Sequence, residues 1–87
     1  MTLNSTIQAL SDQTRRKILE LLKKKDMSAG EIGKHFSITL PSLSHHLNVL
    51  KQNELVTFER KGQEIIYSLN LSVFEETAKV LIKFFKK

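Results

Sequence analysis

The sequence predicts a mainly α-helical fold with one β-hairpin, in a single domain that spans residues 1–87. Apolar residues recur at helical spacing in five segments, most of them preceded by residues suited to cap a helix. Two short stretches of alternating character follow one another across a Gly-Gln pair. The chain has no linker, repeat or low-complexity tract, and its 87 residues are the length of one small domain.

The first two helices are predicted within the first 25 residues. The apolar edge of the first, at about residues 2–10, consists of Leu3, Ile7 and Leu10. Ser11 and Asp12 are both good N-cap residues and begin a second helix. Its apolar stripe runs over residues 18–22, and it ends in the lysines at 23–25, which complement the helix dipole.

A capping box predicts the start of the third helix. Ser28 and Glu31 have the spacing at which each side chain can bond the other residue's backbone N–H. The side chains that this helix should bury are Ala29, Ile32 and Phe36. Ser37 and Ile38 then make a brief connection to the next helix.

The stretch from Ile38 to Lys51 predicts the helix around which the chain is organised. Thr39 suits its N-cap, and Pro41 is tolerated in the first turn because its missing N–H has no helical partner to lose. An apolar stripe consists of Leu43, Leu47 and Leu50, and the opposite face carries Ser42, Ser44, His45 and Asn48. Asn53 is expected to end the helix in the left-handed conformation.

This helix has a face of short, uncharged side chains with hydrogen-bonding groups. Such a face can lie in the major groove of DNA and offer donors and acceptors to base edges. An ordinary amphipathic surface helix is the alternative interpretation of the same pattern. The short helix before it, joined by a three- or four-residue turn, makes the pair a helix-turn-helix, whose second member is called the reading helix below.

A β-hairpin is predicted over residues 55–61 and 64–69, with Gly62 and Gln63 between the strands. Its inward positions are expected to be Val56, Phe58, Ile65, Tyr67 and Leu69. Arg60 and Lys61 lie at the tip, where they could reach phosphates or the minor groove beside the reading helix. A basic hairpin in that place is a wing; a solvated basic tip is the alternative.

The last helix is predicted to cover residues 72–86. Ser72 and Glu75 have capping-box spacing, and the apolar residues that follow wrap more than one face. Exposed apolar area of that kind usually marks an interface. We therefore expect residues 2–10 and 72–86 to pack against their copies in a two-fold homodimer. The candidate interface residues are Leu3, Ile7, Phe74, Leu81, Phe84 and Phe85.

Charge and composition limit the classes of function. Fourteen Lys and Arg against nine Asp and Glu give a net charge of +5, which favours a polyanionic partner but does not require one. No apolar run is long enough for membrane insertion, and the N-terminus lacks the layout of a signal peptide, so we expect a cytoplasmic location. No phosphate loop, nucleophile elbow or carboxylate pair is present, so we expect no enzymatic activity.

The sequence resembles the ArsR/SmtB-type winged-helix repressors, and is most similar to their SdpR-like autorepressor branch. The matching segments are residues 9–19 (ALSDQTRRKIL), 42–51 (SLSHHLNVLK), 55–56 (LV), 60–63 (RKGQ) and 67–69 (YSL). The resemblance implies a winged helix-turn-helix homodimer that binds double-stranded DNA at an inverted repeat in a promoter and blocks transcription. The family's DNA-contacting positions fall on Pro41, Ser42, Ser44 and His45, just after Leu40. With Thr39, Arg60 and Lys61, these are the candidate DNA-binding residues.

We expect no metal and no other cofactor. Metal-sensing members of this family use a cysteine pair before the reading helix, or Asp and His ligands on the last helix. This chain has no cysteine, and its three histidines, His35, His45 and His46, lie before the last helix. Adjacent helical residues diverge by about 100°, so His45 and His46 cannot easily share an ion. His46 is expected at the edge of the core, and His45 is the better candidate for a DNA contact.

A second class of function stays open from the sequence. The chain could be a protein-interaction module, or a regulator controlled by a protein anti-repressor, with weak DNA binding. A membrane-anchored anti-repressor would be compatible with the SdpR-like branch. Salt dependence separates the alternatives, because affinity for DNA falls steeply as salt rises.

Overall fold

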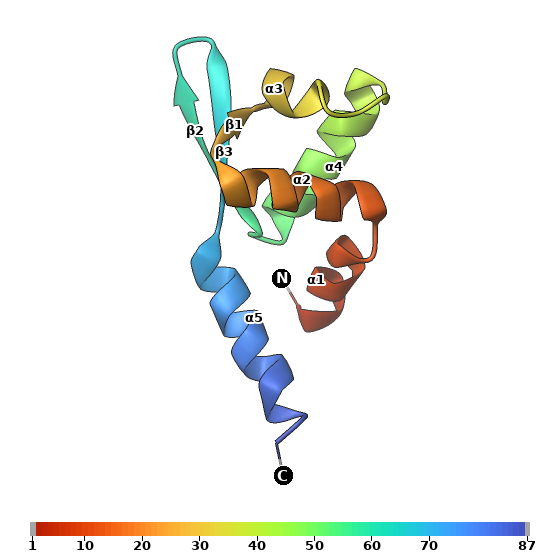
Figure 1. Ribbon diagram of the computed structural model, residues 1–87, viewed down its shortest axis with the longest axis vertical. Helices are drawn as coiled ribbons and strands as arrows, with labels where there is room; N and C mark the ends of the chain where they lie inside the picture. Colours follow the sequence, from red (N-terminus) through yellow and green to blue (C-terminus); the bar gives the residue numbers. More distant parts are fainter. Residues whose placement is uncertain (1, 87) are drawn as a thin grey trace.

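Helices form most of the fold, and a small antiparallel sheet completes it, in this computed structural model that describes residues 2–86 (Figure 1). The elements are α1 (Leu3–Leu10), α2 (Gln13–Lys24), β1 (Met27–Ser28), α3 (Ala29–Gly33), α4 (Leu40–Gln52), β2 (Val56–Lys61), β3 (Glu64–Leu69) and α5 (Leu71–Lys83). The predicted fold class, mainly helical with a β-hairpin, is confirmed. Among residues 2–86, no helix combines the length and the apolar character needed to span a membrane.

The sheet has the strand order β1-β3-β2, with all pairs antiparallel. The hairpin register runs from Val56 opposite Leu69 to Lys61 opposite Glu64. Gly62 turns the chain with a φ of 64°, where a residue with a Cβ would be strained. The sequence did not predict β1, because two residues are too few to show alternation and Ser28 also caps α3.

The core lies between the helices and the sheet. Its fully buried large side chains are Ile18, Ile32, Leu50 and Leu55. They come from α2, α3, α4 and the approach to β2, so helices distant in sequence share one apolar centre. The reading helix contributes the predicted stripe, with Leu43, Leu47 and Leu50 all buried. Its inner face is therefore fixed by packing.

Hydrogen-bonding side chains begin several helices as predicted. The Asp12 carboxylate accepts from the Arg15 amide at 2.9 Å and starts α2. Ser28 and Glu31 form the predicted capping box of α3. Thr39 caps α4 by accepting from the Ser42 amide at 3.2 Å. Each cap holds a helix start at the residue where the sequence placed it.

The end of α4 differs from the prediction. Glu54, and not Asn53, adopts the left-handed conformation, with a φ of 56°. The amides of Glu54 and Leu55 donate to the carbonyls of Lys51 and Leu50, each at 3.0 Å, which is the Schellman pattern. Asn53 is buried instead, and its side-chain amide donates to the Val49 carbonyl at 2.9 Å. Asn53 is therefore a helix cap through its side chain.

The start of α5 also differs. The helix begins at Leu71, with Asn70 at the N-cap and no side-chain capping bond, so the predicted box of Ser72 and Glu75 is wrong. The Asn70 side chain donates to the Glu54 carbonyl at 2.9 Å. This bond ties the start of α5 to the end of α4 and takes the Asn70 side chain away from the first turn of α5.

Two aromatic residues lie in less buried positions than expected. Phe58 is 55% exposed because β2 is an edge strand, and the Lys51 ammonium lies 4.3 Å from its ring centre. Phe36 lies beyond the end of α3, which stops at Gly33, and rests partly buried against the core. The connection to the reading helix is therefore residues 34–39, longer than the turn that the sequence predicted.

The last helix projects from the rest of the molecule (Figure 1). Its extension gives the chain principal dimensions of 49 × 24 × 22 Å. None of its residues is buried, although Val73 and Phe74 rest partly on the core. The chain on its own therefore leaves most of the apolar surface of α5 uncovered.

Candidate nucleic-acid interface

The exposed face of α4 is uncharged and rich in hydrogen-bonding groups. No Lys, Arg, Asp or Glu occurs between positions 40 and 50. Ser44, His45 and Asn48 are exposed at spacings that place them on one side of the helix, opposite the buried leucines. A hydroxyl, an imidazole and an amide supply both donors and acceptors. These side chains can therefore reach base edges without charge or bulk keeping the helix away.

The individual candidates differ in exposure. Pro41, Ser44 and His45 are exposed, as predicted, and Thr39 is exposed while serving as the N-cap. Ser42, which the sequence analysis placed on the outer face, is only partly exposed. Gln52 is exposed one turn beyond Asn48 and was not among the candidates. Its place on the face is visible only once the helix is known to continue to residue 52.

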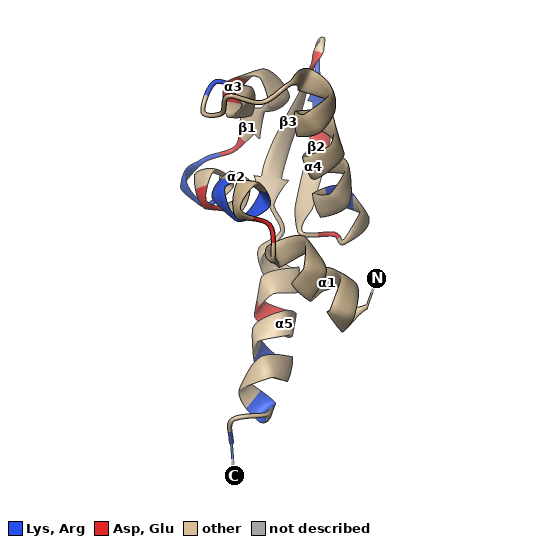
Figure 2. Ribbon diagram, turned by 90° about the vertical axis from the view of Figure 1, so that its right-hand side faces the viewer, with Lys and Arg blue, Asp and Glu red and all other residues tan. Residues whose placement is uncertain are grey.

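Basic residues lie outside this face. Lys and Arg occur on α2, on the last turn of α4, on the hairpin and on α5 (Figure 2). At the hairpin tip, Arg60 pairs with Ile65 and Lys61 with Glu64, and both basic residues are exposed. Consecutive strand residues point to opposite faces, so Arg60 and Lys61 lie on different sides of the ribbon. An uncharged helix face suits base edges, and basic residues on other elements suit phosphates.

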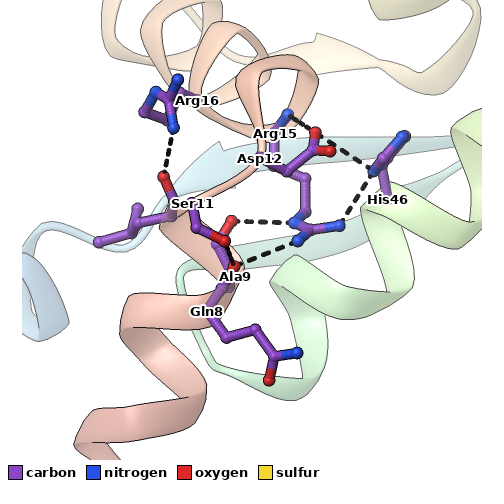
Figure 3. Close-up of polar contacts among 8 residues, drawn as sticks. Gln8, Ala9, Ser11, Asp12, Arg15, Arg16 and His46 are labelled. Atoms are coloured by element: carbon purple, nitrogen blue, oxygen red, sulfur yellow. Dashed lines mark hydrogen bonds and ion pairs between the residues drawn. The ribbon is translucent and has the colours of Figure 1, made fainter.

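Arg15 connects three helices through one guanidinium group (Figure 3). Its Nε donates to the Ala9 carbonyl at 2.9 Å, and a terminal nitrogen donates to the Gln8 carbonyl at 3.2 Å. Its other terminal nitrogen lies 3.2 Å from Nδ1 of His46 on α4. A guanidinium only donates, so Nδ1 accepts and His46 is neutral in this arrangement. Arg15 thereby holds the end of α1 and the inner side of the reading helix to α2.

Arg16 also connects the end of α1 to the start of α2. Its guanidinium donates to the Leu10 carbonyl at 2.8 Å, so two arginines occupy the carbonyl end of α1. Positive charge there complements the helix dipole. The sequence showed these residues only as a basic cluster, because spacing along the chain does not reveal that α1 ends beside the start of α2. Arg15 and Arg16 join α1 to α2 through these hydrogen bonds, so their guanidinium groups are less available to a polyanion than their charge suggests.

His46 lies at the edge of the core, with its side chain 13% exposed. Burial lowers the pKa of His46, as do Arg15 and His45, while the Asp12 carboxylate, whose Oδ2 lies 3.8 Å from Nδ1, partly opposes the shift. The pKa of Asp12 is lowered mainly by the hydrogen bond that its carboxylate accepts from the backbone amide of Arg15. The folded chain therefore favours neutral His46 beside ionised Asp12.

The free energy of unfolding is expected to fall as pH drops below about 6.5, the ordinary pKa of histidine. In that window the unfolded chain takes up a proton on His46 while the folded chain resists it, so protonation favours unfolding. Urea unfolding at a series of pH values measures this. His46→Gln should flatten the pH dependence, whereas His45→Gln, which leaves the buried ring in place, should retain it. An identical dependence in His46→Gln would assign the effect to other groups.

The terminal helices carry most of the exposed large apolar side chains. Leu3 and Ile7 on α1 are 38% and 48% exposed, and Leu81, Phe84 and Phe85 near the end of the chain are 39%, 76% and 85% exposed. Phe74 differs from the other predicted interface residues, since it packs partly on the core of its own chain. Exposed residues that the sequence analysis did not select are Leu71, Val80 and Ile82. The apolar surface at this end is larger than the six candidates indicated.

No cluster of three His, Cys, Asp or Glu side chains suited to a metal ion occurs within residues 2–86. The histidines nearest one another are His45 and His46, whose ring centres are 5.6 Å apart and tilted by 56°. Arg15 also lies against Nδ1 of His46, so one of the two ring nitrogens of this histidine already has a cationic neighbour. The expectation of no metal site stays a prediction.

Comparison with known proteins identifies the family. The model of the arsR family of bacterial regulatory proteins matches residues 12–57, more than half of the chain. The transcriptional repressor SdpR of Bacillus subtilis (strain 168) is 52% identical over 85 residues, covering 98% of this chain and 94% of that protein. The arsenical resistance operon repressor of Staphylococcus aureus is 36% identical over 74 residues, covering 85% of this chain and 71% of that protein.

Solved structures show the same fold. An ArsR-like transcriptional regulator from Rhodococcus sp. RHA1 superposes with a TM-score of 0.85 at 33% identity, covering 94% of this chain and 77% of that one. The homodimeric winged helix-turn-helix DNA-binding domain of Mb0332 from Mycobacterium bovis gives a TM-score of 0.76 at 26% identity, covering 91% and 74%. The resemblance inferred from the sequence is thus confirmed, and the chain belongs to the arsR family of bacterial regulatory proteins, with their winged helix-turn-helix fold.

Proposed function

We propose that this protein is a homodimeric repressor that binds an inverted-repeat operator through α4 and acts without a metal ion. The exposed, uncharged face of α4, backed by three buried leucines, is the observation that supports this most directly. The SdpR relative is a transcriptional repressor by name, which supports repression as the outcome of binding. Autorepression is the more specific form of the proposal, in which the operator lies upstream of the protein's own gene.

Base recognition would fall to the centre of the α4 face. The major groove of B-DNA admits an α-helix, and each base pair presents a distinct pattern of donors and acceptors there. Ser44, His45 and Asn48 are exposed on this face, where they would meet the base edges of such a groove. Ser42, being partly buried, is assigned the lesser role of helix start, with Thr39. Pro41 has no hydrogen-bonding group in its side chain, so it would contact the groove by van der Waals packing.

Two-fold symmetry would arise from the terminal helices. The apolar residues of α1 and α5 exceed what one chain covers, and a second copy is the partner that offers the same surface. A dimer of this kind presents two reading helices, and half-sites about 34–36 Å apart on the duplex would form an inverted repeat. The homodimeric Mb0332 domain supports this arrangement by its similar fold.

Selection of duplexes from a random pool tests the proposal. The purified protein should enrich an inverted repeat, and the repeat should occur upstream of its own gene if it is an autorepressor. Ser44→Ala and His45→Ala should each weaken binding to that repeat by about 1–3 kcal/mol and leave binding to random DNA nearly unchanged. Ser72→Ala, at an exposed serine on α5, is the matched control and should change neither.

Two results would count against the proposal in different ways. Equal losses on selected and random DNA would remove the base-reading role of these side chains. Failure to retain any duplex, even at low salt, would reject DNA binding altogether and favour a protein-interaction module. Repression measured from a reporter carrying the selected repeat then tests the outcome of binding.

The wing is expected to contribute phosphate contacts. Lys61→Ala should weaken binding to all sequences alike and make the dependence of log affinity on log salt shallower by about one unit, because one fewer counterion is released. Binding titrations over a range of salt concentrations give this slope. Lys79→Ala, at an exposed lysine on α5, should leave the slope unchanged. The same slope for Lys61→Ala and wild type would show that Lys61 does not contact DNA.

A further inference from the structure

Leu40 is a large apolar side chain at the start of an otherwise polar face. It is 79% exposed, and among the exposed large apolar residues within residues 2–86 only Phe85 exceeds it. It is the first residue of α4. This helix begins at the end of the molecule away from α5 (Figure 1). The apolar surface of the terminal helices therefore does not extend to Leu40, and an interface formed by those helices would leave it uncovered.

The local structure holds Leu40 outward. Thr39 caps the helix and Pro41 limits the backbone of the first turn, while Leu43 turns inward and is buried. Leu40 and Ile38 border a recess of about 280 Å³ between α3 and α4, whose wall includes Gly33 and Leu43. Ser44 and Lys34 lie on the same rim. The apolar rim thus continues directly into the polar face that we propose enters the major groove.

Major-groove chemistry narrows what Leu40 can contact there. Its side chain can neither donate nor accept a hydrogen bond. Among the four bases, only thymine presents an apolar group on the major-groove edge, its 5-methyl. The first residues of a reading helix are those that contact base edges in helix-turn-helix complexes. We propose that Leu40 recognises one thymine in each half-site by contact with its 5-methyl group; this rests on the proposed function.

Deoxyuridine tests this contact at the level of one methyl group. In the selected operator, each thymine is replaced in turn by deoxyuridine, symmetrically in both half-sites, which preserves base pairing and removes only the methyl. Wild-type protein should lose affinity at one thymine position, by about fourfold per half-site, as expected for exposing one buried methyl-sized group. Leu40→Ala should bind the thymine and deoxyuridine operators equally, so that the two changes are coupled in a double-mutant cycle.

Matched variants separate recognition from folding and from general apolar loss. Leu71 is likewise an exposed leucine, 62%, at the first residue of a helix. Leu71 belongs to the apolar surface proposed for the dimer, so the control is the ratio of affinities measured on one variant: Leu71→Ala should bind the thymine operator more tightly than the deoxyuridine operator by the same factor as wild type. Leu40→Gln, which introduces a hydrogen-bonding side chain at the same place, should lose the penalty. Reselection with this variant should enrich adenine at this position, since glutamine can form two hydrogen bonds with adenine.

The outcomes distinguish this inference from the function on which it rests. If no thymine methyl affects wild-type binding, or if Leu40→Ala keeps the full penalty, Leu40 does not read thymine, while selective binding to the operator still supports the proposed repressor. If the protein selects no operator, the proposed function fails and the thymine contact fails with it. If Leu40→Ala binds the operator as tightly as wild type, the contact between Leu40 and the thymine methyl is also rejected, and contact with a protein partner becomes the alternative role for this residue.

Discussion

Phe84→Asp is expected to convert the protein to monomers and to lower its affinity for an inverted-repeat operator by about two to four orders of magnitude. Phe84 is 76% exposed in the single chain, at the end of α5. A carboxylate at that position would have to be desolvated in an apolar interface, which costs far more than leaving it in water. Loss of the dimer removes the second half-site contact, and with it the gain that linked binding provides.

Sedimentation and titration of the operator measure the two effects. Because Phe84 is mostly exposed, the core of the single-chain fold should survive, and circular dichroism should show that loss of helix is limited to α5. Lys79→Asp introduces the same residue on the polar side of the same helix and should stay dimeric. An intact dimer in Phe84→Asp would exclude the end of α5 from the interface, whatever the DNA affinity.

Leu50→Ala is expected to lower the free energy of unfolding by about 2–5 kcal/mol. Leu50 is fully buried where α4 meets the core, so shortening it removes buried apolar atoms and leaves a cavity. Domains of this kind are stable by about 5–15 kcal/mol, so the variant would lose a large part of its stability. It should also weaken DNA binding, since the reading helix depends on this packing.

Leu40→Ala provides a control on the same helix with the same chemical change. Leu40 is 79% exposed, so its truncation should alter stability by no more than about 0.5 kcal/mol. Denaturant titrations should be done at one protein concentration, because dimerisation adds to apparent stability. Similar stability of Leu50→Ala and wild type would show that the leucine stripe does not anchor α4.

The sequence predicts those elements that local chemistry determines. The α4 helix follows from the spacing of Leu43, Leu47 and Leu50 and from the Thr39 cap, and all four residues act as expected. The hairpin follows from alternation around Gly62. Each of these signals is contained within about ten residues, and that is why each could be identified without the fold.

What the sequence did not predict depends on contacts between distant segments. Asn70 bonds to Glu54 across 16 positions, and this replaces the expected capping box. The strand β1 exists because β3 pairs with it. In the candidate site, Arg15 was visible only as charge, while its bond to His46 spans 31 positions. Which residues of α4 are exposed also depends on how the helix packs: Ser42 is partly buried and Gln52 is exposed, and the sequence predicted neither.

The uncovered α5 has a consequence for the abundance of the protein. Its 13 residues include none that is buried, and isolated helices of that length are only marginally stable in water. Chains at low abundance would therefore keep frayed ends that proteases can cut, whereas chains at high abundance would shield one another. The turnover rate would then depend on dosage, with scarce protein degraded quickly and plentiful protein persisting.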